Sequence, residues 1–181
     1  LSLQAYNLND PKTRHILEES RSRVLALAFV HELLYQNSSL RHLEVSSYIE
    51  KLVHYHLKAQ QGDHGPVDVA INIDDVQLQM NNAISIGLIT NELVSNALEH
   101  AFVDQPSGSL HVSLVPKSSN LILTVADDGV GLPPNFESAR SSSLGLELVQ
   151  TLAKQLGGTF RYNSGKGATC QIEFPAMEIG Y

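Results

Sequence analysis

The sequence predicts an α+β protein in which a helical hairpin is followed by a two-layer α/β sandwich with a mixed, mostly antiparallel sheet. Three observations support this prediction. Residues 11–36 place apolar side chains at steps of three and four, which is typical of a long helix with a heptad seam. Residues 67–73 alternate apolar and polar side chains, as later segments do, and this period indicates half-buried strands. Residues 86–102 carry an apolar arc at the helical period, which indicates a helix packed on one side.

The composition describes an ordinary globular protein, with 43% of the 181 residues apolar and 17% charged. Acidic residues outnumber basic ones 19 to 12, and the net charge of −7 argues against nucleic-acid binding as the main function. No apolar run is long enough for a membrane span and no signal-peptide pattern is present, so we expect a cytoplasmic protein. The start, Leu1-Ser2-Leu3, resembles a helix cut partway, so we expect a fragment of a longer protein.

The cysteine and the histidines give no indication of a metal site. Cys170 lies in an alternating strand pattern and has no second cysteine to pair with, so it is predicted to be a small buried hydrophobic residue. His54 and His56 stand two positions apart on one predicted helix, and this spacing puts them on different faces. No histidine and cysteine cluster has the spacing of a zinc site, so we expect no structural metal.

The first sixty residues are predicted to be helical. A helix ends near Asn7, and Asp10 and Pro11 then suit the cap and first position of the next helix. The seam of that second helix consists of Leu17, Ser20, Val24, Leu27, His31 and Leu34. Because a single seam needs partner helices, the first helix and a second copy of the chain would complete a four-helix bundle. We therefore expect a homodimer through the helical hairpin.

The remaining elements follow from turn signals and periodicity. Ser46 or Ser47 can cap a third helix, and the polar stretch 60–66 contains glycine and proline, so we place the domain boundary there. The two domains would be residues 1–60, with the dimerisation helices, and residues 61–181. In the second, strands are predicted at 67–73, 110–115, 121–125, 159–162 and 168–174, and helices through 86–102 and over 144–156.

The helix through 86–102 has a polar side whose residues could bind a ligand. Glu92, Asn96 and Glu99 share that side at i, i+4 and i+7, and His100 is adjacent. A carboxylate and a carboxamide one turn apart can hold a hard cation and steer a water molecule. The alternative is a solvated polar helix face without a ligand.

Glycine-containing elements follow this helix at the ends of predicted strands and helices. Asp127-Asp128-Gly129-Val130-Gly131 comes directly after a strand, Leu144-Gly145-Leu146 opens a helix, and residues 165–169 form a hairpin. Glycine permits a close approach to the backbone, and a helix N-terminus attracts phosphate. Each element alone is also explained by a simple turn, so the informative feature is the ordered set.

In this order the motifs resemble the ATP-binding domain of two-component sensor histidine kinases, in the wider GHKL group with the Bergerat fold shared with gyrase, Hsp90 and MutL. Residues 92–102 resemble the N box, 127–131 the G1 box, 143–145 a reduced G2 box and 165–169 the last glycine element. Residues 1–59 resemble the dimerisation and phosphotransfer helices of the HisKA_2 type. Their matching phrases are Leu1-Ser2-Leu3-Gln4-Ala5, Asp10-Pro11 and residues 27–36.

The resemblance implies ATP and Mg²⁺ as cofactors and a role for each residue. Asp127 would accept a hydrogen bond from the adenine amino group, while Gly129 and Gly131 let the backbone approach the base. Asn96 would be the Mg²⁺ ligand, and Glu92 would be the catalytic residue that orients or deprotonates the attacking group. The other expected nucleotide-binding residues are His100, Gly145, Leu146 and Thr169. The loop 132–143 would act as a small lid.

Some positions depart from the family pattern. Glu99 stands where many members have a lysine, and a carboxylate there would repel phosphate, so we expect it to point to solvent. Gly145 is the single glycine of the G2 box, preceded by three serines. No residue matches the phosphoacceptor phrase, which would lie upstream of Leu1. His31 on the heptad seam fits a packed bundle residue better than a replacement nucleophile, and His15 has no supporting motif.

The function implied is that of a sensor histidine kinase core. It would transfer the γ-phosphoryl group of ATP to a histidine and then to an aspartate on a response regulator receiver domain, under control of an upstream sensor domain. A degenerate, non-catalytic dimeric docking scaffold is the alternative. A serine kinase acting on a regulatory protein, as anti-sigma factors do, is a third possibility.

Overall fold

The computed structural model describes residues 10–36, 43–59, 65–105, 107–133, 136 and 143–176. Within these ranges the helices are α2 (Pro11–Gln36), α3 (Val45–Ala59), α4 (Met80–His100) and α6 (Leu144–Gln155). The strands are β1 (Leu43–Glu44), β2 (Val67–Ile73), β3 (Gln77–Leu78), β4 (Gly108–Lys117), β5 (Asn120–Asp127), β6 (Thr159–Gly165) and β7 (Gly167–Pro175). The predicted α+β class is confirmed.

The main sheet has the strand order β2-β4-β5-β7-β6 and is mostly antiparallel, as predicted. Its one parallel pair joins β2 to β4, with Val67 opposite Gly108 and Ile73 opposite Leu114. Parallel neighbours need a crossover connection, and α4 supplies it because it lies between β2 and β4 in the chain. A separate two-stranded ladder joins β1 to β3.

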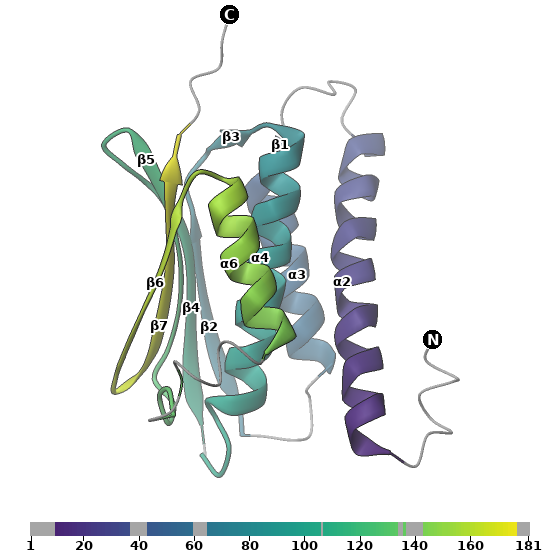
Figure 1. Cartoon of the computed structure of the whole chain (residues 1–181), viewed down its shortest axis with the longest axis vertical. Coiled ribbons are helices and arrows are strands. Elements are labelled where there is room, and N and C mark those ends of the chain that lie inside the picture. Colours follow the sequence, from purple (N-terminus) through teal and green to yellow (C-terminus); the bar gives the residue numbers. More distant parts are fainter. Residues whose placement is uncertain are drawn as a thin grey trace, which may run out of the picture.

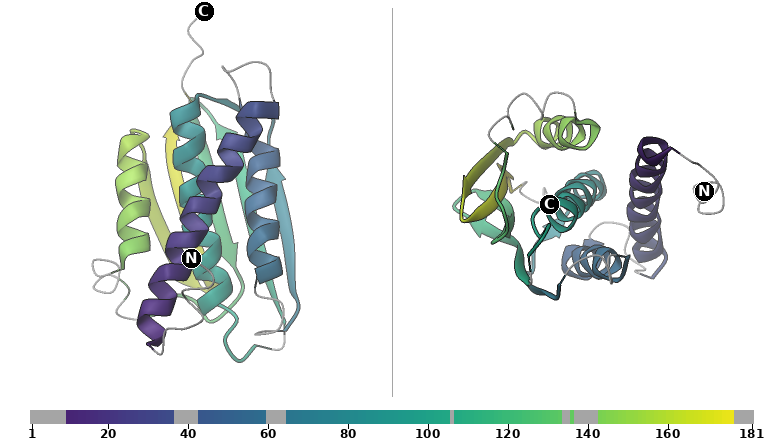
Figure 2. Two further views of the ribbon diagram at one scale, coloured as in Figure 1. Left: turned by 90° about the vertical axis from the view of Figure 1, so that its right-hand side faces the viewer. Right: turned by 90° about the horizontal axis from the view of Figure 1, so that it is seen from below.

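The described helices lie on one face of this sheet in two layers (Figures 1 and 2). α3, α4 and α6 cover the sheet, and α2 crosses α4 and α3 on the side away from it. The sheet therefore covers one side of α4 and α2 covers the other. None of the described helices combines the length and the apolar character that crossing a membrane requires.

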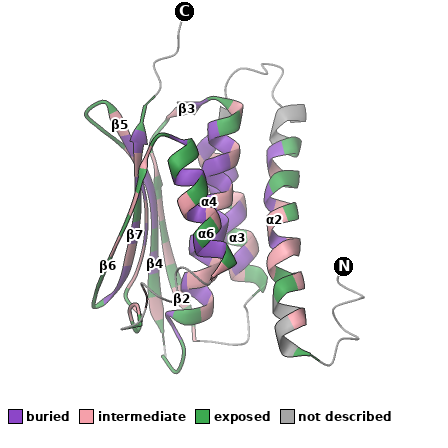
Figure 3. Cartoon of the chain, viewed as in Figure 1, coloured by how far each residue is buried: buried purple, intermediate pink, exposed green. Residues whose placement is uncertain are grey.

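The core lies between the sheet and the layer of α3, α4 and α6. Its fully buried members include Ile86, Ile89, Val112, Leu114, Leu123, Val149 and Ile172. The predicted apolar arc of α4 is buried, and Asn91 and Glu92, which lie outside that arc, are buried as well. Figure 3 shows buried positions along α4. Buried polar groups of this kind require hydrogen-bond partners, and those of Asn91 and Glu92 come from neighbouring helices, as described below.

One face of α2 packs against the rest of the chain and another is exposed to solvent. Ser22, Ala26 and Val30 are buried, whereas Val24 and Leu27 of the predicted seam are 55% and 45% exposed. The seam thus faces away from α3 and α4 and is open to other helices. The expected first helix lies outside the described residues.

The start of α3 differs from the prediction. The helix begins at Val45, so the prediction that Ser46 or Ser47 precedes it as a cap is wrong. β1 leads directly into this helix and pairs with β3, so a strand ladder holds the chain at the point where the helix begins.

Candidate nucleotide-binding site

A cavity of about 590 Å³ lies among α4, the end of β5, α6 and β7. It brings together five of the residues predicted from the sequence: Asn96, His100, Asp127, Gly131 and Leu146. Most of its remaining wall is apolar, as a site for a flat aromatic base requires. Glu92, Gly129, Gly145 and Thr169 were also predicted, but they are not among its lining residues.

Asp127 is the last residue of β5 and lines the cavity. Its Oδ1 accepts hydrogen bonds from the backbone N–H groups of Gly129, at 3.0 Å, and Ala168, at 3.1 Å. Both bonds end on Oδ1, so Oδ2 has no hydrogen-bond donor among the residues that the structure describes. Partial burial raises the pKa of Asp127, and the two backbone hydrogen bonds oppose this shift. The carboxylate is thus fixed in orientation with one oxygen left to bind a ligand.

Two glycines after Asp127 have different structural roles. A Cβ on Gly129 would lie 2.0 Å from the carbonyl oxygen of Ala101, so this glycine lets the loop rest on the end of α4. Gly131 has a φ of +77°, a conformation that favours glycine, and it lines the cavity. Gly131 therefore lies where it could meet a ligand, while Gly129 is needed for packing; their approach to a base stays a prediction.

Asn96 and His100 lie one turn apart on α4, and both side chains line the cavity. Glu99 lies between them in sequence, is half-buried and does not line the cavity. A carboxamide and an imidazole therefore face the cavity, and the carboxylate of Glu99 does not.

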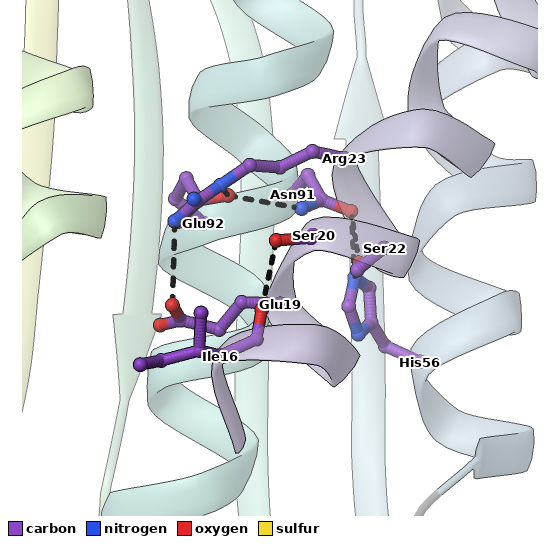
Figure 4. Close-up of polar contacts among 8 residues, drawn as sticks. All are labelled: Ile16, Glu19, Ser20, Ser22, Arg23, His56, Asn91 and Glu92. Atoms are coloured by element: carbon purple, nitrogen blue, oxygen red, sulfur yellow. Dashed lines mark hydrogen bonds and ion pairs between the residues drawn. The ribbon is translucent and has the colours of Figure 1, made fainter. Parts of the chain in front are cut away.

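Glu92 is bound by a residue of α2. The guanidinium of Arg23 donates two hydrogen bonds to its carboxylate, Nε to Oε1 and Nη2 to Oε2, each 2.8 Å long (Figure 4). Glu92 is only 5% exposed, and its hydrogen bond raises the pKa of Arg23. A Cβ on Gly145 would lie 2.6 Å from Oε2, so the carboxylate rests between α2 and the first turn of α6.

Asn91 forms a second buried contact between the same helices. Its Oδ1 accepts hydrogen bonds from Ser22 Oγ, at 2.7 Å, and from His56 Nε2, at 2.9 Å, and its Nδ2 donates to Glu92 Oε1. Burial lowers the pKa of His56, so the ring favours its neutral form. His56 was not predicted to be buried, although it continues the helical series of Ile49, Leu52 and Val53.

The first turn of α6 forms another part of the cavity wall. Ser143, the N-cap residue, and Leu146 line the cavity, and a helix N-terminus attracts anions. Within the predicted lid, Phe136 lines the cavity and its ring packs against Tyr162 with centroids 4.7 Å apart. Residues 137–142, with the serines at 141 and 142, lie outside the described part of the chain.

β7 contributes alternate residues to the cavity. Ala168 and Cys170 line it, whereas the intervening Thr169 points to the opposite face of the sheet. Cys170 is buried as predicted, and burial, followed by the nearby Asp127, raises the pKa of its thiol to about 12. No group of three potential metal ligands among histidine, cysteine, aspartate and glutamate occurs within the described residues.

Comparison with known proteins matches two family models to this chain. The model for the histidine kinase-, DNA gyrase B-, and HSP90-like ATPase matches residues 81–178. The HisKA_2 histidine kinase model matches residues 1–60.

Similar proteins include kinases from several bacteria. Blue-light-activated histidine kinase 2 of Erythrobacter litoralis is 34% identical over 63% of this chain and 34% of its own length. Sensor histidine kinase PdtaS of Mycobacterium tuberculosis is 32% identical over 84% of this chain and 30% of its own. The chain thus spans about a third of the length of these relatives. An anti-sigma F factor of Geobacillus is 30% identical over 45% of this chain and 56% of its own.

A solved structure shares the arrangement of most of this chain. The histidine kinase domain from Erythrobacter litoralis EL346 superposes with a TM-score of 0.79 and 25% identity, over 87% of this chain and 75% of that one. The matched family model covers α6, most of α4 and β4 to β7, and therefore every residue that lines the cavity. The chain belongs to the family of histidine kinase-, DNA gyrase B- and HSP90-like ATPases, with helices of the HisKA_2 histidine kinase type ahead of the ATPase domain.

Proposed function

We propose that this chain is the kinase core of a two-component sensor histidine kinase. It would bind Mg-ATP in the cavity, and the γ-phosphoryl group would pass to a histidine and then to an aspartate of a response regulator receiver domain. The observation that carries this proposal is the orientation of Asp127, which lines the cavity and whose Oδ1 is held by two backbone amides. The names of the similar kinases support the same assignment.

The adenine ring fits the end of the cavity that contains Asp127. Its amino group can donate to Oδ2, while Leu93, Ala97 and Cys170 supply apolar wall. Guanine presents a carbonyl in place of that amino group and would face a carboxylate oxygen. A hydrogen bond to a charged group contributes about 1.5–3 kcal/mol, enough to select adenine.

The triphosphate and Mg²⁺ fit the end formed by α4 and α6. The chemistry of the residues present suits them, because Mg²⁺ takes few protein ligands and Asn96 offers a single carboxamide oxygen on the cavity wall. His100 and the N-terminus of α6 would contact the phosphates. When bound, Mg²⁺ neutralises phosphate charge, and the protein contributes mainly position and electrostatic stabilisation. Glu92 would orient or deprotonate the attacking group once its carboxylate is accessible.

The partners proposed are a second copy of the chain, a receiver domain and an upstream sensor domain, in the cytoplasm. The apolar seam of α2, exposed at Val24 and Leu27, supports pairing through the helical part. We also propose the division into residues 1–60 and 61–181. α3, which lies before this boundary, packs in the same helical layer as α4.

One observation favours the scaffold alternative. Glu92, the proposed catalytic residue, is bound by Arg23 and does not line the cavity. In a scaffold, this ion pair would be a permanent structural contact. The anti-sigma F factors support the serine kinase alternative, but they match only about half of this chain, and the HisKA_2 helices favour histidine chemistry.

Calorimetric titration with Mg-ATP tests the proposal, with Asp127→Asn as the control variant. Asparagine keeps an Oδ1 for Gly129 and Ala168 but turns an amino group toward adenine. We expect binding at least about tenfold weaker in the variant, because the loss of about 1.5–3 kcal/mol corresponds to roughly 10–150-fold. Wild-type binding no tighter than that of the variant would lead us to adopt the scaffold alternative. In a separate measurement, acid-labile phosphate on the full-length protein would distinguish phosphorylation of histidine from that of serine.

A further inference from the structure

The contact between α2 and α4 indicates a role for α2 in controlling the nucleotide site. We propose that α2 acts as a latch, in which Arg23 binds Glu92 and withholds its carboxylate from bound Mg-ATP until α2 undocks. This inference rests on the proposed function, since it assigns Glu92 to the nucleotide reaction. It concerns the inner face of α2, which is distinct from the exposed seam.

Contacts on two sides of the Glu92 carboxylate keep it out of the cavity. Arg23 engages both carboxylate oxygens at 2.8 Å, and Glu19 lies 3.7 Å from the same guanidinium. Gly145 closes the other side, where a side chain would meet Oε2. Glu92 is nevertheless adjacent to the cavity, because its neighbours Leu93 and Asn96 line it. A movement of α2 would remove the guanidinium from the carboxylate, which would keep its hydrogen bond from Asn91 Nδ2 and its contact with the first turn of α6.

The contact surface of α2 combines polar and apolar contacts. Ser22, Ala26 and Val30 are buried, the ring of Phe29 packs against Tyr55 of α3, and the hydrogen bonds of Ser22 and Arg23 connect α2 to α4. Val24 and Leu27 point away. A buried ion pair contributes little net stability compared with apolar packing, but its rupture is costly when one partner stays buried. Loss of the cationic partner of Glu92 would therefore weaken the docking of α2.

Mg²⁺ provides the link to the nucleotide. A cation held by Asn96 would lie near a residue one helical turn earlier, and it would compete with the guanidinium for the Glu92 carboxylate. Mg-ATP would then favour undocked α2, whereas ATP without metal would not. Linkage requires the reverse as well, so a protein that cannot latch must bind Mg-ATP more tightly.

The test compares Mg-ATP affinity in wild type, Arg23→Gln and Arg23→Gln combined with Glu92→Gln. We expect Arg23→Gln to bind Mg-ATP about fivefold or more tightly, with affinity for ATP in EDTA unchanged or weaker. Glu92→Gln should abolish the gain, because the two residues act through one contact. Arg161→Gln, which removes an exposed positive charge on β6, serves as the matched control and should show no gain.

Hydrogen exchange of wild-type α2 gives an answer even if Arg23→Gln does not fold. The latch predicts that Mg-ATP lowers the protection of residues 19–30 and that ATP in EDTA does not. Unchanged protection, or an Arg23→Gln variant that releases α2 without binding Mg-ATP more tightly, would show that Arg23 is only a structural contact. If wild type does not bind Mg-ATP at all, the proposed function fails and the latch fails with it.

Discussion

At the scale of single residues, Asn91 shows how a buried polar group obtains its partners from distant parts of the chain. Its Oδ1 receives donors from Ser22 and His56, which are 69 and 35 residues away in sequence. If the Asn91 amide lost these donors, its oxygen would stay buried without a hydrogen bond, which costs about 1–3 kcal/mol for each unsatisfied group. This explains why a serine and a histidine lie in helix faces that are otherwise packed.

His56 should make stability depend on pH. Burial lowers its pKa below the ordinary 6.5, despite weaker opposing effects of Asn91 and Glu92. In the window just below pH 6.5 the unfolded chain therefore binds the proton more readily than the folded one. The stability contributed by neutral His56 is present above pH 6.5 and is lost as pH falls toward the folded pKa.

Urea unfolding between about pH 5 and pH 7.5 measures this effect. We expect His56→Gln, which keeps a donor for Asn91, to show a flatter dependence of unfolding free energy on pH than wild type. His54→Gln is the matched control, since His54 is exposed on the same helix, and it should keep the wild-type slope. Equal slopes in wild type and His56→Gln would show that another group dominates this window.

At the scale of elements, α6 meets α4 at Gly145, where an added Cβ would press on the carboxylate of Glu92. We expect Gly145→Ala to push Glu92 away from Arg23, because its Cβ would lie 2.6 Å from Oε2. Overpacking of this kind costs about 1–3 kcal/mol in the free energy of unfolding, measurable by chemical denaturation.

Gly165→Ala is the control for that substitution. Gly165 lies at the end of the β6–β7 hairpin, and a Cβ added there would have no described atom within 4 Å beyond its chain neighbours. We therefore expect a change of at most about 0.5 kcal/mol in the free energy of unfolding. A Gly145→Ala protein as stable as this control would mean that α6 shifts easily away from α4.

Most elements could be predicted from the sequence because their cause is local. α2 has the predicted bounds, and the strands and α6 lie within a few residues of their predicted positions. This is because the spacing of apolar residues in a segment indicates whether a helix or a strand would bury them on one face. The spacing of apolar residues alone did not identify the buried face of α2. That helix has apolar or small residues on two arcs, one with Ala26 and Val30 and one with Val24 and Leu27, and only packing against α3 and α4 selects the first.

At the scale of the whole molecule, the stack of sheet, helical layer and α2 leaves the outer arc of α2 open. We expect Val24→Glu to weaken self-association in sedimentation equilibrium, because a charge would enter the proposed seam between two copies. Its effect on the unfolding of a single chain should stay near about 0.5 kcal/mol, since Val24 is 55% exposed.

Val103→Glu provides the comparison for self-association. Val103 is also a valine, 45% exposed, but it lies in the turn after α4 rather than on α2. Both variants add one negative charge, so a difference between them locates the contact. If Val24→Glu sediments like wild type, the seam is not the dimer contact.

The same three-layer arrangement separates residues that are neighbours in the predicted motifs. Asn96 and His100 face the cavity, while Glu92, one turn earlier on the same helix, faces α2 and binds Arg23. The helical period places all three near one side of α4, but part of that side contacts α2 and part of it lines the cavity. Thr169 is separated from Ala168 and Cys170 by the alternation of β7 in the same way.

The fold class, most elements and the family could be read from the amino-acid sequence, because periodicity, turn residues and motif order are properties of short segments. Asp127 was predicted as a site residue for the same reason, since a carboxylate at a strand end followed by glycines is a local pattern. The pairing of Arg23 with Glu92 and of Asn91 with His56 became visible only in the folded chain. These pairs join residues far apart in the sequence, and no local pattern specifies which helix will cover a buried polar group.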